Sequence, residues 1–170
     1  MKKIPLANKS VFIAASFLVA APLMAQQDQN LDLIGQVQAI CDVGDPGPTD
    51  GFDFSSPGGS DSISISGISI QCNSANGVTV ALTSRNGALQ AGNVNSVNYQ
   101  ASLTGLSGSL NLFLNADNSG NALRAQADVA ASQELADGSG SLSLDIEVPT
   151  TPTFSGIYTD TLTINLISGG

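Results

Sequence analysis

The sequence predicts an all-β fold, in which one sandwich domain of short strands is held together by a single disulfide. Three observations lead to this prediction. From Leu31 onward, apolar and polar residues alternate with period two, which is typical of half-buried strands. Clusters of Gly, Asn, Asp and Pro interrupt this alternation at intervals typical of a sandwich. The only two cysteines, Cys41 and Cys72, form an even pair, which in an exported chain indicates one disulfide.

The first 25 residues have the features of a secretory signal peptide, so we expect the segment 1–25 to be removed on export. It combines three lysines with an apolar run from Val11 to Ala21, and it ends on the small residue Ala25. This run is shorter than the about 20 residues that a membrane-spanning helix needs, and no later stretch approaches that length. We therefore expect a mature chain of 145 residues with no membrane insertion, which is the usual size of one domain.

The mature chain is strongly acidic. Arg85 and Arg124 are its only basic residues, and they stand against 14 acidic residues for a net charge of −12. Binding to nucleic acid needs a basic face that contacts phosphates, so we expect no nucleic-acid partner. Attraction to an anionic membrane surface is disfavoured for the same reason. For each arginine we expect at most a surface ion pair, which adds little stability.

The residues that enzymes need are also missing. Nucleophilic triads use a His or Lys as base, and the mature chain has neither. Its acidic residues lie mainly in turns, and no Trp is present to build an aromatic cleft for a sugar. We therefore expect no enzymatic activity and no cofactor.

The cysteine pair would close a loop of 30 residues. In the chain-entropy description such a disulfide stabilises the fold by about 3 to 4 kcal/mol. The alternative, two free thiols or two metal ligands, lacks any His or further Cys to complete a metal site.

The strands follow one another along the chain. The first is marked by an apolar set of one parity that is broken only at Gly35: Leu31, Leu33, Val37, Ala39 and Cys41. A Gly, Pro and Asp-rich loop with Phe52 and Phe54 comes next. Ile63 and Ile65 then have one parity and Ile68 and Ile70 the other, which predicts a β-bulge or break at Gly67.

Further alternating apolar sets predict the later strands, for about seven in all: Val78, Val80 and Leu82; Val97, Tyr99, Ala101 and Leu103; Leu110, Leu112 and Leu114; Leu142, Leu144, Ile146 and Val148; and Tyr158, Leu162, Ile164 and Leu166. The segment Ala122 to Ala136 fits two patterns. Its Leu and Ala residues alternate, but they also make a helical stripe. Because strands flank it on both sides, we favour a strand followed by a loop.

One acidic cluster invites a metal-site interpretation. Asp42, Asp45, Asp50 and Asp53 lie in the loop after the first cysteine, and Ca²⁺ binds oxygen ligands from such loops. Their spacing matches no EF-hand, and the intervening Gly and Pro residues are ordinary turn formers. We therefore favour a solvated loop and expect no metal site.

Taken in order, these features resemble a chaperone-usher pilus subunit, and more narrowly the archaic, spore-coat-U-like (Csu-type) family. The resemblance spans about Gly35 to Leu166 and rests on the following residues: Gly35-x-Val37-x-x-x-Cys41, the loop with Phe52 and Phe54, Cys72, Arg85, Tyr99, and the closing run Gly156-Ile157-Tyr158-Thr159-Asp160-Thr161-Leu162-Thr163-Ile164. The closing run combined with the early cysteine pair is its most specific part.

The resemblance implies an incomplete immunoglobulin-like sandwich that lacks its seventh strand. A periplasmic chaperone would fill the gap until the N-terminal extension of another subunit replaces it. On this prediction residues 26–34 are the donor extension, with Leu31 and Leu33 as its apolar face, and 35–170 form the pilin domain. The closing strand, with Tyr158, Leu162, Ile164 and Leu166, faces the groove and the chaperone.

The resemblance therefore predicts a structural subunit of a surface pilus with a role in adhesion or biofilm formation. It implies export through the periplasm to the cell surface, with identical or related subunits, a chaperone and an outer-membrane usher as partners. Two alternatives stay open. Leu31 and Leu33 begin the chain's own first strand if no donation occurs, and the protein is then a self-contained secreted coat or adhesin sandwich without strand exchange.

Overall fold

The structure is a computed structural model that describes residues 34–47, 51–54, 58–92, 95–117 and 120–169. The predicted signal peptide and the predicted donor residues Leu31 and Leu33 lie outside these residues. Val37–Gly170 forms one compact unit. In the described part of the chain, antiparallel strands dominate and helix is nearly absent, so the predicted all-β class is confirmed.

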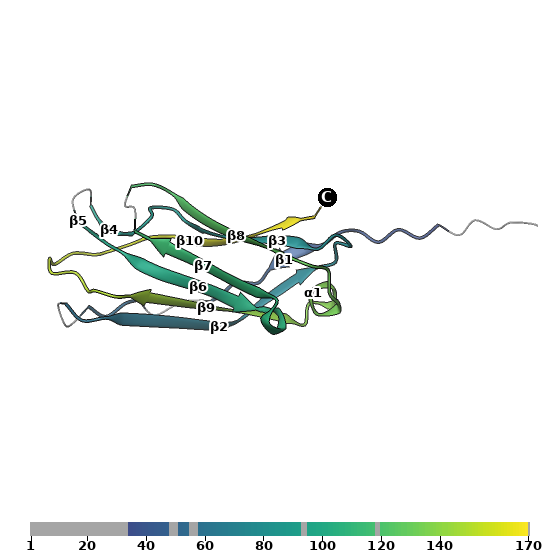
Figure 1. Cartoon of the computed structure of the whole chain (residues 1–170), viewed down its shortest axis with the longest axis horizontal. Helices are drawn as coiled ribbons and strands as arrows, with labels where there is room; N and C mark the ends of the chain where they lie inside the picture. Colours follow the sequence, from purple (N-terminus) through teal and green to yellow (C-terminus); the bar gives the residue numbers. More distant parts are fainter. Residues whose placement is uncertain (1–33, 48–50, 55–57, 93–94, 118–119, 170) are drawn as a thin grey trace, which may run out of the picture. The chain divides into compact units, whose positions relative to one another are not determined.

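Two main sheets and a small hairpin make up this unit (Figure 1). The larger sheet has the order β1 (Cys41–Val43), β2 (Asp61–Cys72), β9 (Gly140–Val148), β6 (Tyr99–Gly105) and β7 (Leu110–Ala116). The smaller sheet has the order β10 (Leu162–Ser168), β3 (Val78–Ser84) and β8 (Leu123–Val129). The hairpin pairs β4 (Leu89–Ala91) with β5 (Asn95–Val97), and a 3₁₀ turn, η1 (Leu106–Gly108), joins β6 to β7.

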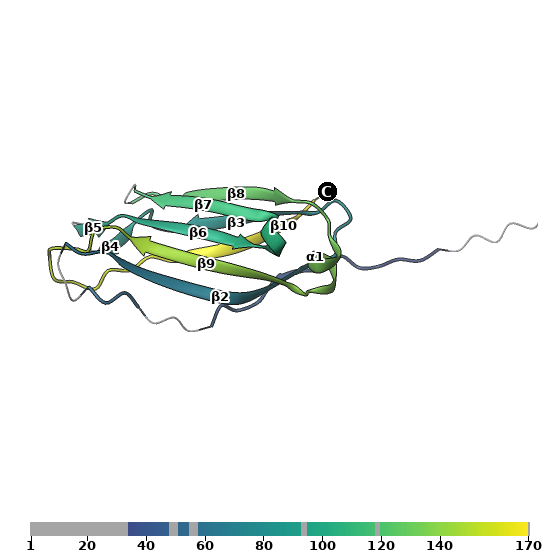
Figure 2. The ribbon, with the colours of Figure 1, turned by 60° about the horizontal axis from the view of Figure 1, so that its bottom comes forward.

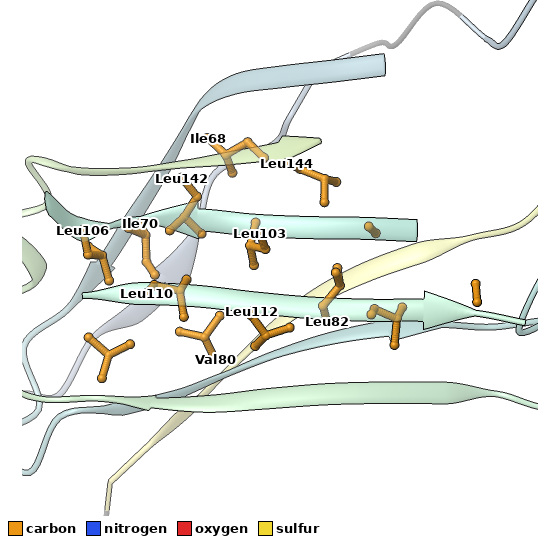
Figure 3. Close-up of a cluster of buried hydrophobic side chains, with 14 of the residues drawn as sticks. Ile68, Ile70, Val80, Leu82, Leu103, Leu106, Leu110, Leu112, Leu142 and Leu144 are labelled. Atoms are coloured by element: carbon orange, nitrogen blue, oxygen red, sulfur yellow. The ribbon is translucent and has the colours of Figure 1, made fainter. Parts of the chain in front are cut away.

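The core lies between the two sheets, and it is built by the period-two alternation that the sequence shows. In β7 every second residue is buried, beginning with Leu110, and the residues between them are exposed. Figure 3 shows these side chains meeting apolar side chains from β2, β3, β6 and β9. Strands β7 and β8, one from each sheet, lie side by side along one flank of the unit (Figure 2).

The predicted irregularity at Gly67 is confirmed. The pairing of β2 with β9 shifts register between Ile65 and Ile68, and Gly67 has φ of 77°. A Cβ at this position would meet nothing within 4 Å, so there is room for a side chain. Glycine is favoured here because of the positive φ. The shift returns the Ile68 side of the strand to the face that already holds Ile63 and Ile65.

The first predicted strand is wrong in its extent. Pairing begins only at Cys41, and the described residues 34–40 belong to no strand. Ile34 and Val37 have exposed fractions of 95% and 85%. An alternating pattern makes a strand only where it pairs with a neighbouring strand, and residues 34–40 form no ladder with the described part of the chain.

The first half of the segment Ala122 to Ala136 forms strand β8, as favoured, but a short helix, α1 (Gln133–Asp137), stands where we predicted a loop. Ser132 caps the helix by accepting a hydrogen bond from the Leu135 amide at 3.2 Å, and Gly138 ends it in the left-handed conformation. Leu135 is fully buried, which fixes the helix on the unit.

Two other boundaries also differ from the prediction. The run from Val97 to Leu103 breaks at Asn98, so that Val97 closes the β4–β5 hairpin while β6 starts at Tyr99. The closing strand begins at Leu162, and Tyr158 precedes it in a segment attached to β4 by one isolated bridge, Gln90 to Thr159.

Candidate functional site: an open groove between two sheet edges

One flank of the unit carries two strand edges that have no ladder partner among the described residues. Strand β10 ends the smaller sheet, with β3 on one side and nothing paired on the other. In the larger sheet, β2 pairs with β9 along one edge. On its other edge β1 pairs only with Ile70 to Cys72, so Asp61 to Ile68 have no ladder partner on that side. Near the disulfide, β1 lies next to β10 without a backbone ladder in the described residues. The flank opposite β7 and β8 is therefore open.

Apolar side chains line this open flank. Leu162, Ile164 and Leu166 alternate along β10 on its inner face and are half-buried, whereas the residues between them are exposed. Their register partners on β3 include Leu82 and Val80, which are fully buried. The predicted groove residues of β10 thus form a row that the described core covers only in part.

The groove widens into a pocket of about 640 Å³ where β2 and β10 begin. Its apolar lining comes from six parts of the chain and includes Phe52, Phe54, Ile63, Ile65, Ile146 and Tyr158. Phe52 stacks on Phe54 with ring centroids 5.6 Å apart, and Phe54 meets Tyr158 edge to face at 6.2 Å. An apolar pocket of this size along open backbone edges is suited to an extended peptide with apolar side chains.

A partly buried polar cluster, which we call the Asp160 clasp, holds the rim of the groove. The Asp160 carboxylate accepts hydrogen bonds from Ser84 Oγ at 2.5 Å, Tyr99 OH at 2.7 Å and the Asn86 amide at 2.9 Å. The Thr161 amide donates a fourth at 2.7 Å. These bonds tie the start of β10 to the end of β3 and to the start of β6.

Burial is the main cause that raises the pKa of Tyr99, and the Asp160 carboxylate acts in the same direction. The Tyr99 hydroxyl therefore stays protonated and donates throughout the neutral range. The sequence singled out Tyr99 and the closing run, but it did not reveal that Asp160 accepts a hydrogen bond from the Tyr99 hydroxyl. The available signal was an acidic residue inside an otherwise apolar and Thr-rich run.

The disulfide lies at the far end of the groove and is confirmed. Cys41 and Cys72 are register partners in the β1–β2 ladder and are bonded. Asn73, which the sequence gave no reason to single out, ties down the preceding segment. Its side chain accepts from the Ile40 amide at 2.7 Å and donates to the Gln38 carbonyl at 2.8 Å, and its own amide donates to the Ile40 carbonyl at 3.0 Å. A disulfide is compatible with export to an oxidising compartment.

The acidic loop shows local turn contacts. Asp45 accepts from the Gly47 amide at 2.9 Å, and the Asp53 amide donates to Asp61 at 2.9 Å. Asp50 lies outside the described residues, and within those residues no three metal-binding side chains come together. Arg85 and Arg124 are exposed.

Within the described part of the chain, no helix is long and apolar enough to cross a bilayer. No protein-family model and no curated protein matches the sequence. The functional interpretation therefore rests on the groove and on the motifs of the sequence.

Proposed function

We propose that this chain is a structural subunit of a chaperone-usher surface pilus that polymerises by donor-strand complementation. The observation that carries the proposal is the groove between the unpaired edges of β2 and β10, with its half-buried row Leu162, Ile164 and Leu166. Open strand edges beside apolar surface promote aggregation unless a further strand covers them. An incomplete immunoglobulin-like sandwich that receives its last strand from another molecule accounts for both features.

The proposed donor has the dimensions that the groove requires. Fully extended, residues 26–34 span about 30 Å, and the seven residues of β10 span about 23 Å. A strand added beside β10 would gain backbone hydrogen bonds, while Leu31 and Leu33 entered the groove. Each buried Leu contributes about 1.5 to 3 kcal/mol, which makes the register of the donor as important as its hydrophobicity.

The proposed partners come from the resemblance of the sequence to pilus subunits, and the open groove supports the need for a cover. Before assembly the groove needs a temporary cover, which in this proposal is a periplasmic chaperone, and export of the subunits passes through an outer-membrane usher. The assembled fibre stands on the cell surface, where it serves adhesion or biofilm formation. A structural subunit of a fibre requires no enzymatic activity for this role.

The test compares two adjacent apolar residues of opposite parity. Leu33→Asp should abolish polymer formation, because a charge would enter the apolar groove. Ile34→Asp is the matched control, since Ile34 would point away from the groove, and it should assemble like the parent. Both variants should still be recovered in complex with the chaperone. Size-exclusion chromatography that shows Leu33→Asp polymerising normally, or a parent chain that is a stable monomer, would instead support the self-contained sandwich.

A further inference from the structure

Exposed apolar side chains gather at the two ends of the compact unit. In the described residues seven large apolar side chains are exposed, and two groups account for most of them. One group precedes β1 and includes Val37 and Ile40, at 85% and 51% exposed. The other lies in the loop before β10 and consists of Phe154 and Ile157, at 67% and 86%. Solvent exposure of this extent on side chains of this size suggests contact surfaces.

These two groups cannot cover each other within one molecule. Ile40 is hydrogen-bonded to Asn73, directly after β2 ends at Cys72. The loop that carries Phe154 is attached near the other end of β2, where the Thr151 amide donates to the Gly59 carbonyl at 2.7 Å. Twelve residues of strand separate these ends by roughly 35 Å. Figure 1 shows the same arrangement, with α1 at one end and the β4–β5 hairpin at the other.

The direction of the two open strands determines where a donated strand would leave the groove. Strand β10 ends near the residues that follow β2, since the Gly169 amide donates to the Gly77 carbonyl at 3.0 Å and Ser74 Oγ donates to the Gly169 carbonyl. Strands β2 and β10 therefore run in the same direction. All ladders in the described residues are antiparallel, and a strand antiparallel to both edges must run from the Ser168 end toward the Leu162 end.

A donated strand that runs in this direction leaves the groove at the Leu162 end, so the folded unit of the donating molecule comes to lie beside the Phe154 loop of the receiving molecule. The donor segment ends at residue 34, and Val37 follows within about 10 Å of chain. In the donor molecule, residues 38–40 are held by Asn73, so the exit from the groove is followed at once by a fixed part of its surface. On the receiving molecule, Phe154 and Tyr158 help to line a second pocket of about 510 Å³ at this end.

We propose that Phe154 and Ile157 of one copy contact Val37 and Ile40 of the copy that donates its strand, so that a second apolar contact locks successive subunits together. This inference rests on the proposed strand donation. On the donating copy it uses Val37 and Ile40, which lie outside the donor segment 26–34. The contact would hide four exposed apolar side chains and restrict the angle between neighbouring subunits.

Cysteine cross-linking of assembled polymers tests the contact. The variant Val37→Cys/Ile157→Cys should give a ladder of disulfide-linked chains on a denaturing, non-reducing gel. The matched control is Val37→Cys/Phe113→Cys, because Phe113 is 56% exposed but lies on β7, away from the proposed contact. It should form polymers without a ladder. The three substituted positions, Val37, Phe113 and Ile157, are all exposed, so folding should not be affected.

The outcomes separate the contact from strand donation. Polymers of both variants with no ladder, or with equal ladders, would overturn the contact and leave strand donation intact. If the parent chain fails to polymerise at all, strand donation is wrong, and the proposed contact, which depends on it, is wrong as well. As a second measurement, Phe154→Ser, at a residue outside the lining of the 640 Å³ groove pocket, should still polymerise but give more flexible fibres in electron micrographs. Fibres of unchanged stiffness would count against the contact.

Discussion

The Asp160 clasp offers the most detailed test of how the groove is held. Asp160→Ala removes the acceptor for four hydrogen bonds and leaves Ser84 Oγ and Tyr99 OH without it. Ser84 is fully buried and Tyr99 is 2% exposed, so water cannot easily replace the lost partner. Leaving a buried polar group unsatisfied costs about 1 to 3 kcal/mol, so the two hydroxyls together give a loss of about 2 to 6 kcal/mol.

Two further variants distinguish the loss of the hydrogen bonds of the clasp from a general effect of removing an acidic side chain. Asp160→Asn keeps an oxygen for the two backbone amides while the hydroxyls can rotate toward its amide group, so we expect a loss of about 1 to 2 kcal/mol. Asp128→Ala is the control, because Asp128 is exposed and accepts one hydrogen bond, from Thr79 Oγ1. Its removal should change the stability by less than about 1 kcal/mol.

The assay is thermal unfolding of the assembled protein, followed by circular dichroism at one fixed subunit concentration, because assembly makes stability concentration-dependent. For a domain of this size each kcal/mol lowers the Tm by about 3 to 5 °C, so Asp160→Ala should melt at least about 6 °C below the parent. Equal Tm values for Asp160→Ala and Asp128→Ala would refute the assignment of the clasp.

Three further perturbations follow from the structure. Gly67→Ala should lower stability by about 1 kcal/mol, since the residue would keep a φ of 77° with free space around its Cβ; unchanged unfolding would show that the bulge is not required. Replacing Cys41 and Cys72 together by Ser should lower the free energy of unfolding by about 3 to 4 kcal/mol and reduce the yield of protein. Mass spectrometry of unreduced peptides from the parent should find the two cysteines joined, and two free thiols would disprove the bond. The pKa of Tyr99 is raised above its ordinary value of 10.0, so the folded state binds this proton more tightly than the unfolded state, and the stability that depends on it is complete below pH 10 and declines as the pH rises further. Tyr99→Phe should reduce this loss of stability at alkaline pH. An identical loss in the variant would exclude Tyr99 as its cause.

Much of the fold could be predicted because local pattern and tertiary environment agree. The alternation in Leu110, Leu112 and Leu114 and the parity change around Gly67 each have one simple structural solution, and the structure contains both. The helix after β8 was missed because it has one buried residue, Leu135, and depends on its capping residues more than on periodicity.

The site could be predicted only in part. The apolar parity of β10 identified Leu162, Ile164 and Leu166, since that signal is local. Bonds between residues far apart in the sequence, such as those from Tyr99 to Asp160 and from Asn73 to Ile40, depend on which strands become neighbours, and no local pattern encodes this. The alternation before Cys41 was interpreted as part of a strand, but the described residues 34–40 form no β-ladder and are held only by hydrogen bonds to Asn73.

Whether the strand is donated in trans can be measured directly. Three variants of the mature chain would combine Leu33→Cys with a cysteine at Leu162, Ile164 or Leu166, so that one of them matches the register of the inserted strand. Oxidation of assembled material from that variant should give a ladder of covalently linked chains on a denaturing, non-reducing gel. A single cross-linked band at the mass of one chain, from a protein that size-exclusion chromatography shows to be monomeric, would mean that the strand pairs within its own molecule and would contradict the proposed function.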